Sequence, residues 1–93
     1  MTVNGSRMVL TGDLDHRAAP YFRAKLAELI AVNPTTITLD LSKLDNLSKA
    51  ALRVLAFERG KLATDGRCLI EGASDTIKAQ LKAEELDEEL III

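Results

Sequence analysis

The sequence predicts an α/β fold: a single domain over residues 1–93, in which three main helices cover a small mixed β-sheet. Predicted strands and predicted helices alternate along the chain. This succession is typical of α/β domains, in which helices form the crossover connections between strands. The Asn4-Gly5 pair between short β-prone runs adds a hairpin, because the tight turn favours residues that tolerate positive φ. With 93 residues, the chain can bury one core but has no room for a separate substrate domain.

The first helix is predicted in the segment DLDHRAAPYFRAKLAELIAVNP, whose apolar residues recur at helical spacing. Asp15 is the predicted N-cap, and the Asn33-Pro34 pair is the predicted stop. Pro20 lies close to this start, so either the first turn is irregular or the regular helix begins nearer Ala18.

A strand, a loop and a second helix are predicted next. The segment TTITLDLS alternates apolar with polar residues, which indicates a strand with one buried face. Residues 44–47, with the sequence LDNL, are predicted to form a loop that ends at Ser48. From Ser48 to about Ala63 the apolar residues return to helical spacing, so we expect a helix there.

The remaining third of the chain predicts a strand, a helix and a last strand. The turn residues Thr64-Asp65-Gly66 lead into RCLIEG, a short apolar strand, and Ser74 is the predicted cap of the third helix. The terminal LIII predicts a final short strand. Because an uncovered edge strand offers unpaired N–H and C=O groups, a homodimer that pairs this strand between two copies is a further prediction.

The composition excludes several classes of function. A net charge of −2, from 12 basic and 14 acidic residues, provides no field that would hold a nucleic acid or an anionic membrane. Cys68 is the only cysteine and His16 the only histidine of the sequence. This excludes disulfides, zinc knuckles and a Ser-His-Asp triad within one chain. No phosphate-binding glycine loop occurs, and no apolar run approaches the roughly 18 residues of a membrane span. We therefore expect a cytoplasmic domain without enzymatic activity, cofactor, metal or membrane insertion.

Three stretches, taken in order, resemble the STAS domain family. MVLTGDLD is similar to the family's opening, a hydrophobic residue followed by Gly, an acidic residue, Leu and Asp. ITLDLSKL resembles its central strand and Asp-Leu-Ser turn, and GRCLIEGAS its later strand and loop. The family includes anti-sigma-factor antagonists, sulfate-transporter tails and the small STAS subunit of bacterial phospholipid-transport ABC complexes.

The resemblance implies that the helix after Ser48 faces a partner protein. When the chain is aligned without a gap from Asp40, the family's acidic position falls on Ser48 and its two hydroxyl positions fall on Lys49 and Ala50. In the antagonists the second hydroxyl position is the phosphorylated serine, so the resemblance implies that this switch is absent here. The family often has Gly where Glu85 stands, which implies a different local turn.

The leading hypothesis is a non-enzymatic adaptor that resembles an anti-sigma-factor antagonist and binds a kinase-like anti-sigma factor. The alternative is a STAS subunit that regulates the ATPase of a phospholipid-transport ABC complex. The predicted partner-binding residues are Ser48, Lys49, Ala50, Arg53 and Phe57. A simpler interpretation makes Ser48 an N-cap and the helix face a solvated one. A sharper interpretation makes Ser48 itself a phosphoacceptor, next to a lysine and a helix dipole.

Two further features stay open at the level of sequence. Glu58 has a helical phase close to the core stripe, for which snorkelling or an unseen partner are the available explanations. An enzyme or small-ligand sensor that uses Asp40, Asp45 and Ser48 is a third functional class, but the sequence supplies it with no base, metal cluster or phosphate loop.

Overall fold

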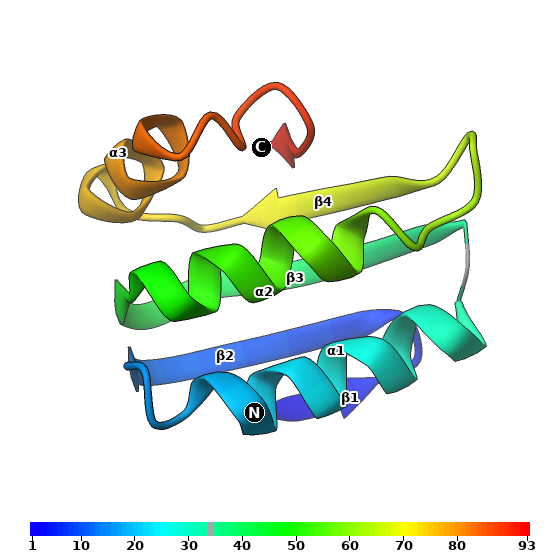
Figure 1. Cartoon of the computed structure of the whole chain (residues 1–93), viewed down its shortest axis with the longest axis horizontal. Coiled ribbons are helices and arrows are strands. Elements are labelled where there is room, and N and C mark those ends of the chain that lie inside the picture. The colour runs from blue at the N-terminus through cyan, green and yellow to red at the C-terminus, as the bar shows by residue number, and fades with distance from the viewer. Residues whose placement is uncertain (34) are drawn as a thin grey trace.

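A computed structural model describes residues 1–33 and 35–93 of the chain. Strands and helices alternate after an initial hairpin, as Figure 1 shows. In chain order the elements are β1 (Thr2–Asn4), β2 (Arg7–Leu14), α1 (Ala19–Val32), β3 (Thr36–Leu47), α2 (Lys49–Arg59), β4 (Arg67–Glu71), α3 (Asp75–Ala83) and β5 (Ile91–Ile92).

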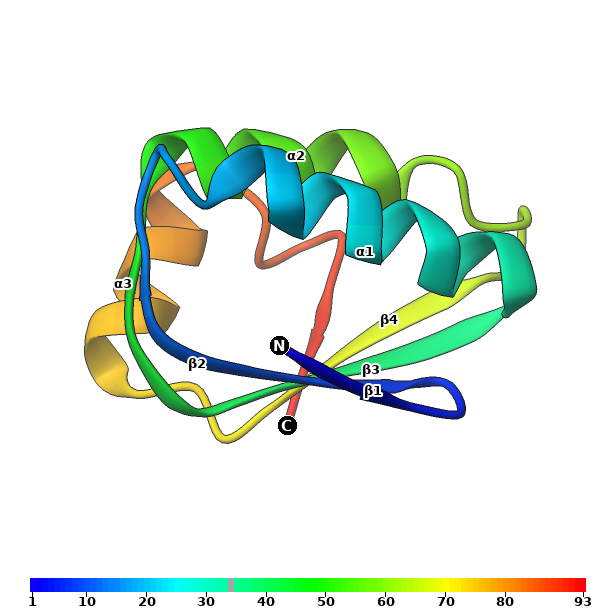
Figure 2. The same cartoon turned by 90° about the horizontal axis from the view of Figure 1, so that it is seen from below.

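The five strands form one mixed sheet in the order β1-β2-β3-β4-β5. β1 pairs antiparallel with β2, and every later pairing is parallel. Helices α1 and α2 lie side by side over one face of the sheet, and α3 lies near the end of the sheet where α2 begins (Figures 1 and 2). The predicted α/β class, the mixed sheet and the three helices are therefore confirmed.

The core lies between the sheet and the two side-by-side helices. Alternate residues of the central strands point into it, among them Met8 on β2 and Leu39 on β3, both with no exposed surface. Phe22 and Leu26 of α1 and Leu55 of α2 close it from above. Burying each such side chain contributes about 1.5–3 kcal/mol, and truncation of Phe22 to alanine would cost about 3–5 kcal/mol. The position of α2 is thus fixed by packing over the sheet.

The N-terminal hairpin turns one residue later than predicted. Asn4 pairs with Arg7, so Gly5 and Ser6 form the two-residue loop. Gly5 has φ +63°, whereas Ser6 is absent from the described residues that have positive φ. This is the pattern of a type II′ turn, in which only the first central residue needs positive φ.

Helix α1 begins without a side-chain cap. Ala18 occupies the N-cap, while the carboxylate of Asp15 accepts hydrogen bonds from the backbone N–H of Arg17 and of Ala18, both at 3.0 Å. The prediction that Asp15 caps the helix was therefore wrong, because Asp15 closes the turn before it. Pro20 fits in the first turn, where a backbone N–H has no helical partner. Asn33 ends the helix as predicted, and Pro34 lies outside the described residues.

Residues 44–47 belong to β3, so the predicted loop was wrong. The strand continues because β2 stays beside it, with Gly12 opposite Leu44 and Leu14 opposite Leu47. Two register shifts interrupt this pairing, and each one places an additional residue in β3. The second shift leaves Asp45 as the additional residue, and the strand leads directly to α2.

Asp40 stabilises the first of these bulges. Its carboxylate accepts hydrogen bonds from the backbone N–H of Ser42 at 3.0 Å and from the Ser42 hydroxyl at 2.7 Å. The guanidinium of Arg7 also pairs with Asp40, at 2.9 Å, and with Glu71 on β4. The hydrogen bonds from Ser42, followed by the charge of Arg7, lower the pKa of Asp40. Asp40 therefore holds the strand geometry that leads to α2.

The later elements follow the prediction with one shortening. Helix α2 ends at Arg59, before Ala63, because the chain turns at Gly60 and the N–H groups of Lys61 and Leu62 bond in i→i−3 fashion. The Ser74 hydroxyl oxygen accepts from the N–H of Ile77, as predicted for the cap of α3.

The C-terminal segment pairs as a strand at the edge of the sheet. β5 lies parallel to β4, and Ile91 and Ile93 keep 43% and 65% of their surface exposed. The predicted last strand is confirmed, and its pairing between two copies stays a prediction.

Candidate functional site

Hydrogen bonds within α2, to β2 and to α3 fix the start of α2, and Ser48 makes the first two of them. Ser48 is the N-cap, with an extended backbone (φ −66°, ψ 163°), and its hydroxyl oxygen accepts from the N–H of Ala51 at 3.2 Å. Its own N–H donates to the carbonyl of Leu14 at 3.0 Å, which joins the end of β2 to the start of α2. The capping interpretation of Ser48 is confirmed, and such a cap contributes about 1 kcal/mol.

A relay of side-chain amides holds the same junction against α3. The Asn46 amide donates to Asp13 at 3.0 Å and accepts from Gln80 at 2.9 Å. The side-chain carbonyl oxygen of Gln80 accepts a hydrogen bond from the backbone N–H of Leu47 at 3.2 Å. Asn46 and Gln80 were not identified from the sequence. Their hydrogen-bond partners lie 33 or 34 positions away in the sequence, so no local pattern indicates these contacts.

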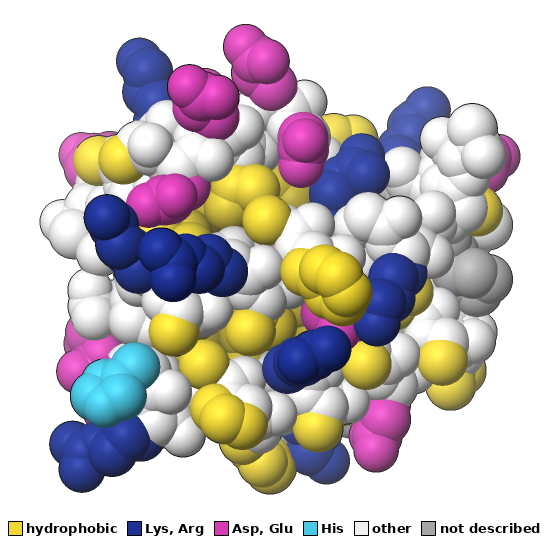
Figure 3. All heavy atoms as spheres, viewed as in Figure 1, with side chains coloured by type: hydrophobic (Ala, Val, Ile, Leu, Met, Phe, Trp, Pro, Cys, Tyr) yellow, Lys and Arg dark blue, Asp and Glu magenta, His cyan; other side chains and the backbone are white. Residues whose placement is uncertain are grey.

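The outward face of α2 carries the other predicted site residues. Lys49 and Arg53 are exposed one turn apart, Ala50 is half-buried, and Phe57 has 58% of its surface exposed. No other described element covers this face, and Figure 3 shows dark blue cationic side chains bordering yellow apolar ones over α1 and α2. The predicted residues therefore share one accessible surface of the helix, whereas Ser48 lies half-buried at its end.

The ring of Phe57 is bracketed by two cations. The guanidinium of Arg23 on α1 lies 5.4 Å from the ring centroid, and the ammonium of Lys61 lies 4.8 Å from it. Each contact contributes about 0.5–1 kcal/mol at an exposed site. The exposed ring of Phe57 is thus contacted both from α1 and from the turn that follows α2.

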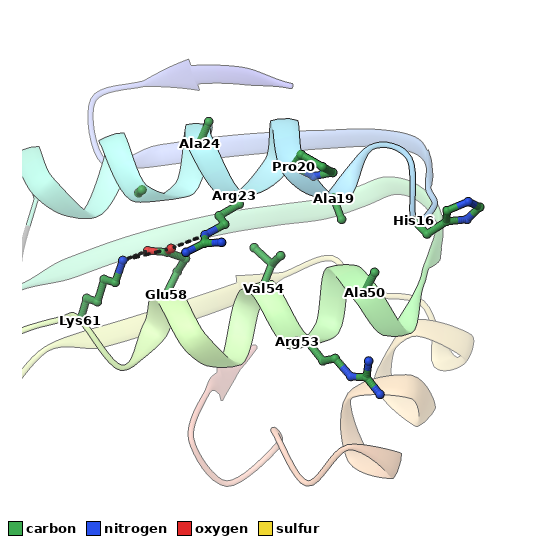
Figure 4. Close-up of a pocket in the computed structure, with 11 residues that line it drawn as sticks. His16, Ala19, Pro20, Arg23, Ala24, Ala50, Arg53, Val54, Glu58 and Lys61 are labelled. Atoms are coloured by element: carbon green, nitrogen blue, oxygen red, sulfur yellow. Dashed lines mark hydrogen bonds and ion pairs between the residues drawn. The ribbon is translucent and has the colours of Figure 1, made fainter.

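Glu58, whose phase was unexplained by the sequence, is buried between the helices beside these cations. It has no exposed surface, and its carboxylate lies 3.5 Å from the Arg23 guanidinium and 3.2 Å from the Lys61 ammonium (Figure 4). The Lys61 ammonium donates a hydrogen bond to Oε1 and lies at the same distance, 3.2 Å, from Oε2. The i,i+3 spacing of Glu58 and Lys61 could have predicted their ion pair from the sequence. The pair with Arg23 could not be predicted in this way, because Arg23 belongs to another helix.

A groove of about 690 Å³ separates the exposed sides of α1 and α2. Small residues from both helices line it, and Figure 4 shows Ala19 across from Ala50 and Val54. A smaller hollow of about 260 Å³ continues it beneath Phe57. Sequence reasoning placed Ala50 on a docking surface but did not find the groove, because a groove needs both helices.

The remaining polar and reactive side chains that the sequence singled out are placed as follows. Within residues 1–33 and 35–93, no cluster of three or more His, Cys, Asp or Glu residues has the arrangement of a metal site. Asp40 is committed to its bulge, Asp45 is exposed, and His16 lies exposed at one end of the groove. Burial raises the pKa of the Cys68 thiol to about 12, which keeps it protonated and unreactive at neutral pH.

The fold is thus an α/β domain with a five-stranded mixed sheet, and an exposed helix face with a cationic and aromatic character lies over one side of it. The family model described as "Mlab, STAS domain" matches residues 1–92. The chain therefore belongs to the STAS family, as the sequence resemblance predicted.

Solved structures agree with this assignment at the level of the fold. The anti-sigma factor antagonist SpoIIAA in its unphosphorylated form is 22% identical, with a TM-score of 0.70 over 100% of this chain and 84% of that one. The Bacillus cell fate determinant SpoIIAA in its phosphorylated form is 24% identical, with a TM-score of 0.69 over 100% of this chain and 87% of that one. None of the curated proteins gives a significant match. In the part of the chain that the structure describes, no helix is long and apolar enough to cross a membrane.

Proposed function

We propose that this chain is a non-enzymatic adaptor, in the class of the anti-sigma-factor antagonists, that binds its partner in the cytoplasm through α2. The observation that carries the proposal is the accessible face of α2, where Lys49, Arg53 and Phe57 project from a helix whose first turn is fixed to β2. A fixed binding surface loses little conformational entropy when the partner docks.

The residue types of this face suit protein recognition. Arginine and aromatic residues are enriched among the residues that dominate binding energy. Burying the exposed ring of Phe57 against a partner would contribute about 1.5–3 kcal/mol, and the two exposed cations would steer an acidic surface toward it. The class of the partner is therefore a protein with an acidic, partly apolar surface, such as a kinase-like anti-sigma factor.

The regulation that we propose differs from a phosphorylation switch at Ala50. Aligned with the family, Ala50 occupies the position of the phosphorylated serine, and a methyl group accepts no phosphoryl group. Binding is then constitutive, or is controlled by how much partner is present. Ser48 carries the hydroxyl at the helix start, where phosphorylation would add a charge of about −2 beside Lys49. We expect Ser48 to be unmodified in protein from its native host, and a phosphate found there by mass spectrometry would overturn this part of the proposal.

The second candidate function is a STAS subunit that regulates the ATPase of a phospholipid-transport ABC complex. The family match, whose description contains the name Mlab, favours it. Both candidates use the same face of α2 and differ in the partner, which is an anti-sigma factor in one case and a P-loop ATPase in the other.

The test captures the partner from native cells with the wild-type chain and with the double charge reversal Lys49→Glu and Arg53→Glu. A matched control reverses Lys78 and Lys82, which are exposed one turn apart on α3. We expect the first variant to lose the partner and the second to retain it, because only the first reverses the charge of the binding surface. Mass spectrometry of the captured protein distinguishes an anti-sigma factor from an ABC ATPase, and equal capture by both variants would refute the proposed surface.

A further inference from the structure

We propose that the groove between α1 and α2 is the seat for a helix of the partner, and that this helix is amphipathic, with small apolar residues on one side and carboxylates along its flanks. The inference rests on the proposed function, because it names the chemistry and shape of the segment that this surface receives. It also extends the binding surface beyond α2, to residues of α1 that the sequence did not indicate.

The shape of the groove favours a helix as the occupant. Its walls are two helices that lie side by side, and small residues repeat along both: Pro20, Ala24 and Ala27 on α1, and Ala50 and Val54 on α2. These are i, i+4 and i+7 spacings, so the small side chains form a stripe along each helix. Small side chains let a third helix approach to the 8–10 Å at which helices pack, with its ridge between the two stripes.

The charge of the groove favours an acidic occupant. Three of its lining residues are cations, Arg23, Arg53 and Lys61, and one is an acid, Glu58. The groove is thus cationic, although the whole chain has a net charge of −2. Arg53 lies on the outer side of α2, while Arg23 and Lys61 point to Glu58 between the helices (Figure 4). Carboxylates on the flanks of a docked helix would meet these cations.

Glu58 orients two of these cations at the base of the groove. It has no exposed surface, and its carboxylate lies 3.5 Å from the Arg23 guanidinium and 3.2 Å from the Lys61 ammonium. Arg23 and Lys61 nevertheless keep 59% and 49% of their side-chain surface exposed, so both can also meet carboxylates of an occupant.

A second copy of this chain fits the groove less well. Two copies that met groove to groove across a two-fold axis would place Arg23, Arg53 and Lys61 of each against the same cations of the other. Like charges that face each other across an interface are unfavourable. Self-association through this face is therefore an outcome that would contradict the inference.

The experiment titrates the isotopically labelled full chain with two synthetic helical peptides. Both have about 18 residues, which span about 27 Å, close to the 28 Å length of the molecule. Both carry alanine and leucine along one side, and the flanks carry glutamate in the first peptide and lysine in the second. Amide chemical shifts locate each peptide, and fluorescence anisotropy gives its dissociation constant.

Two variants of the chain make the location specific. Ala24→Trp places a large ring on the α1 side of the groove, and Ala31→Trp makes the same change at an exposed position two turns further along α1, outside the groove lining. Both positions are exposed, so both variants are expected to fold. We expect the glutamate peptide to bind at least about tenfold more tightly than the lysine peptide, and Ala24→Trp to weaken it at least about tenfold while Ala31→Trp changes it less than about twofold.

The outcomes separate this inference from the proposed function. Equal binding of the two peptides, no shift at groove residues up to millimolar peptide, equal effects of the two tryptophans, or dimerisation through the groove would each overturn the inference. If the native partner is lost with the Lys49 and Arg53 reversals but retained with Ala24→Trp, the proposed function stands and the helix seat does not. If both variants retain the partner, the proposed function itself is refuted.

Discussion

Replacing Glu85 by glycine should stabilise this domain. Glu85 follows the end of α3 with φ +59°, and it has the only positive φ of a non-glycine residue in the described part of the chain. The N–H of Glu85 donates to the carbonyl of Lys82, and the N–H of Leu86 donates to that of Leu81, both at 2.9 Å. These are the two hydrogen bonds of a Schellman motif, whose left-handed residue is usually glycine. The family resemblance, which places Gly at this position, predicts the same site.

The magnitude follows from two opposing contributions. A side chain with Cβ costs about 1–2 kcal/mol in the left-handed conformation, and this cost disappears in Glu85→Gly. Glycine also raises the conformational entropy of the unfolded chain, which opposes the gain by about 0.5–1 kcal/mol. We therefore expect a net increase of about 0.5–1 kcal/mol in the free energy of unfolding. For a domain of this size, that increase corresponds to about 2–8 °C in Tm.

The assay is urea and thermal unfolding followed by circular dichroism, with two control variants. Glu85→Ala removes the charge but keeps Cβ, so it should gain much less than Glu85→Gly. Glu84→Gly places glycine at φ −97°, where no left-handed strain exists, and should destabilise the domain. If Glu85→Gly and Glu85→Ala had equal stabilities, strain at this position would not be the cause and the reasoning would be refuted.

Three other predictions follow from the structure. Ser48→Ala should cost about 1 kcal/mol in urea unfolding, because it removes the cap of α2, and an unchanged midpoint would contradict the capping role. Asp40 has a lowered pKa in the folded state, so its stabilisation is present above its ordinary value of 3.8 and is lost as the pH falls through the folded value. Asp40→Asn should therefore flatten the fall in stability below about pH 4, and an unaltered pH profile would refute this. Cys68 should react with iodoacetamide at least about a hundredfold more slowly in the native protein than in urea, and similar rates would contradict its burial.

Local patterns were sufficient to predict most of the fold. Period-two alternation identified β3, and a short apolar run after turn residues identified β4. Helical spacing identified the three helices, and Ser48 and Ser74 were identified as caps. These features depend on residues within one or two turns of each other. The wrong prediction of a loop concerns a segment whose structure depends on residues distant in the sequence. Residues 44–47 form a strand because β2 lies beside them and pairs with them. Asp15 has the residue type of a cap, but the chain makes one more turn before α1 begins.

In the candidate site, too, features of a single helix were predictable from the sequence and contacts between helices were not. The exposed face of α2 was predictable, because Lys49, Arg53 and Phe57 share a side of one helix. The position of Glu58 near the core was also predictable from its phase. Its pairing with Arg23, and the groove between the two helices, depend on how α1 and α2 pack over the sheet. Contacts between elements distant in the sequence leave no periodic signal, so the structure was needed to find them.

The central claim is that the outward face of α2 is the surface on which the partner docks. Amide hydrogen exchange of the purified complex tests it most directly, when compared with exchange of the free chain. The account predicts that protection on binding is concentrated between Lys49 and Phe57 and that α3 exchanges at an unchanged rate. Protection confined to α3 or to the β5 edge, with α2 exchanging as in the free chain, would contradict it.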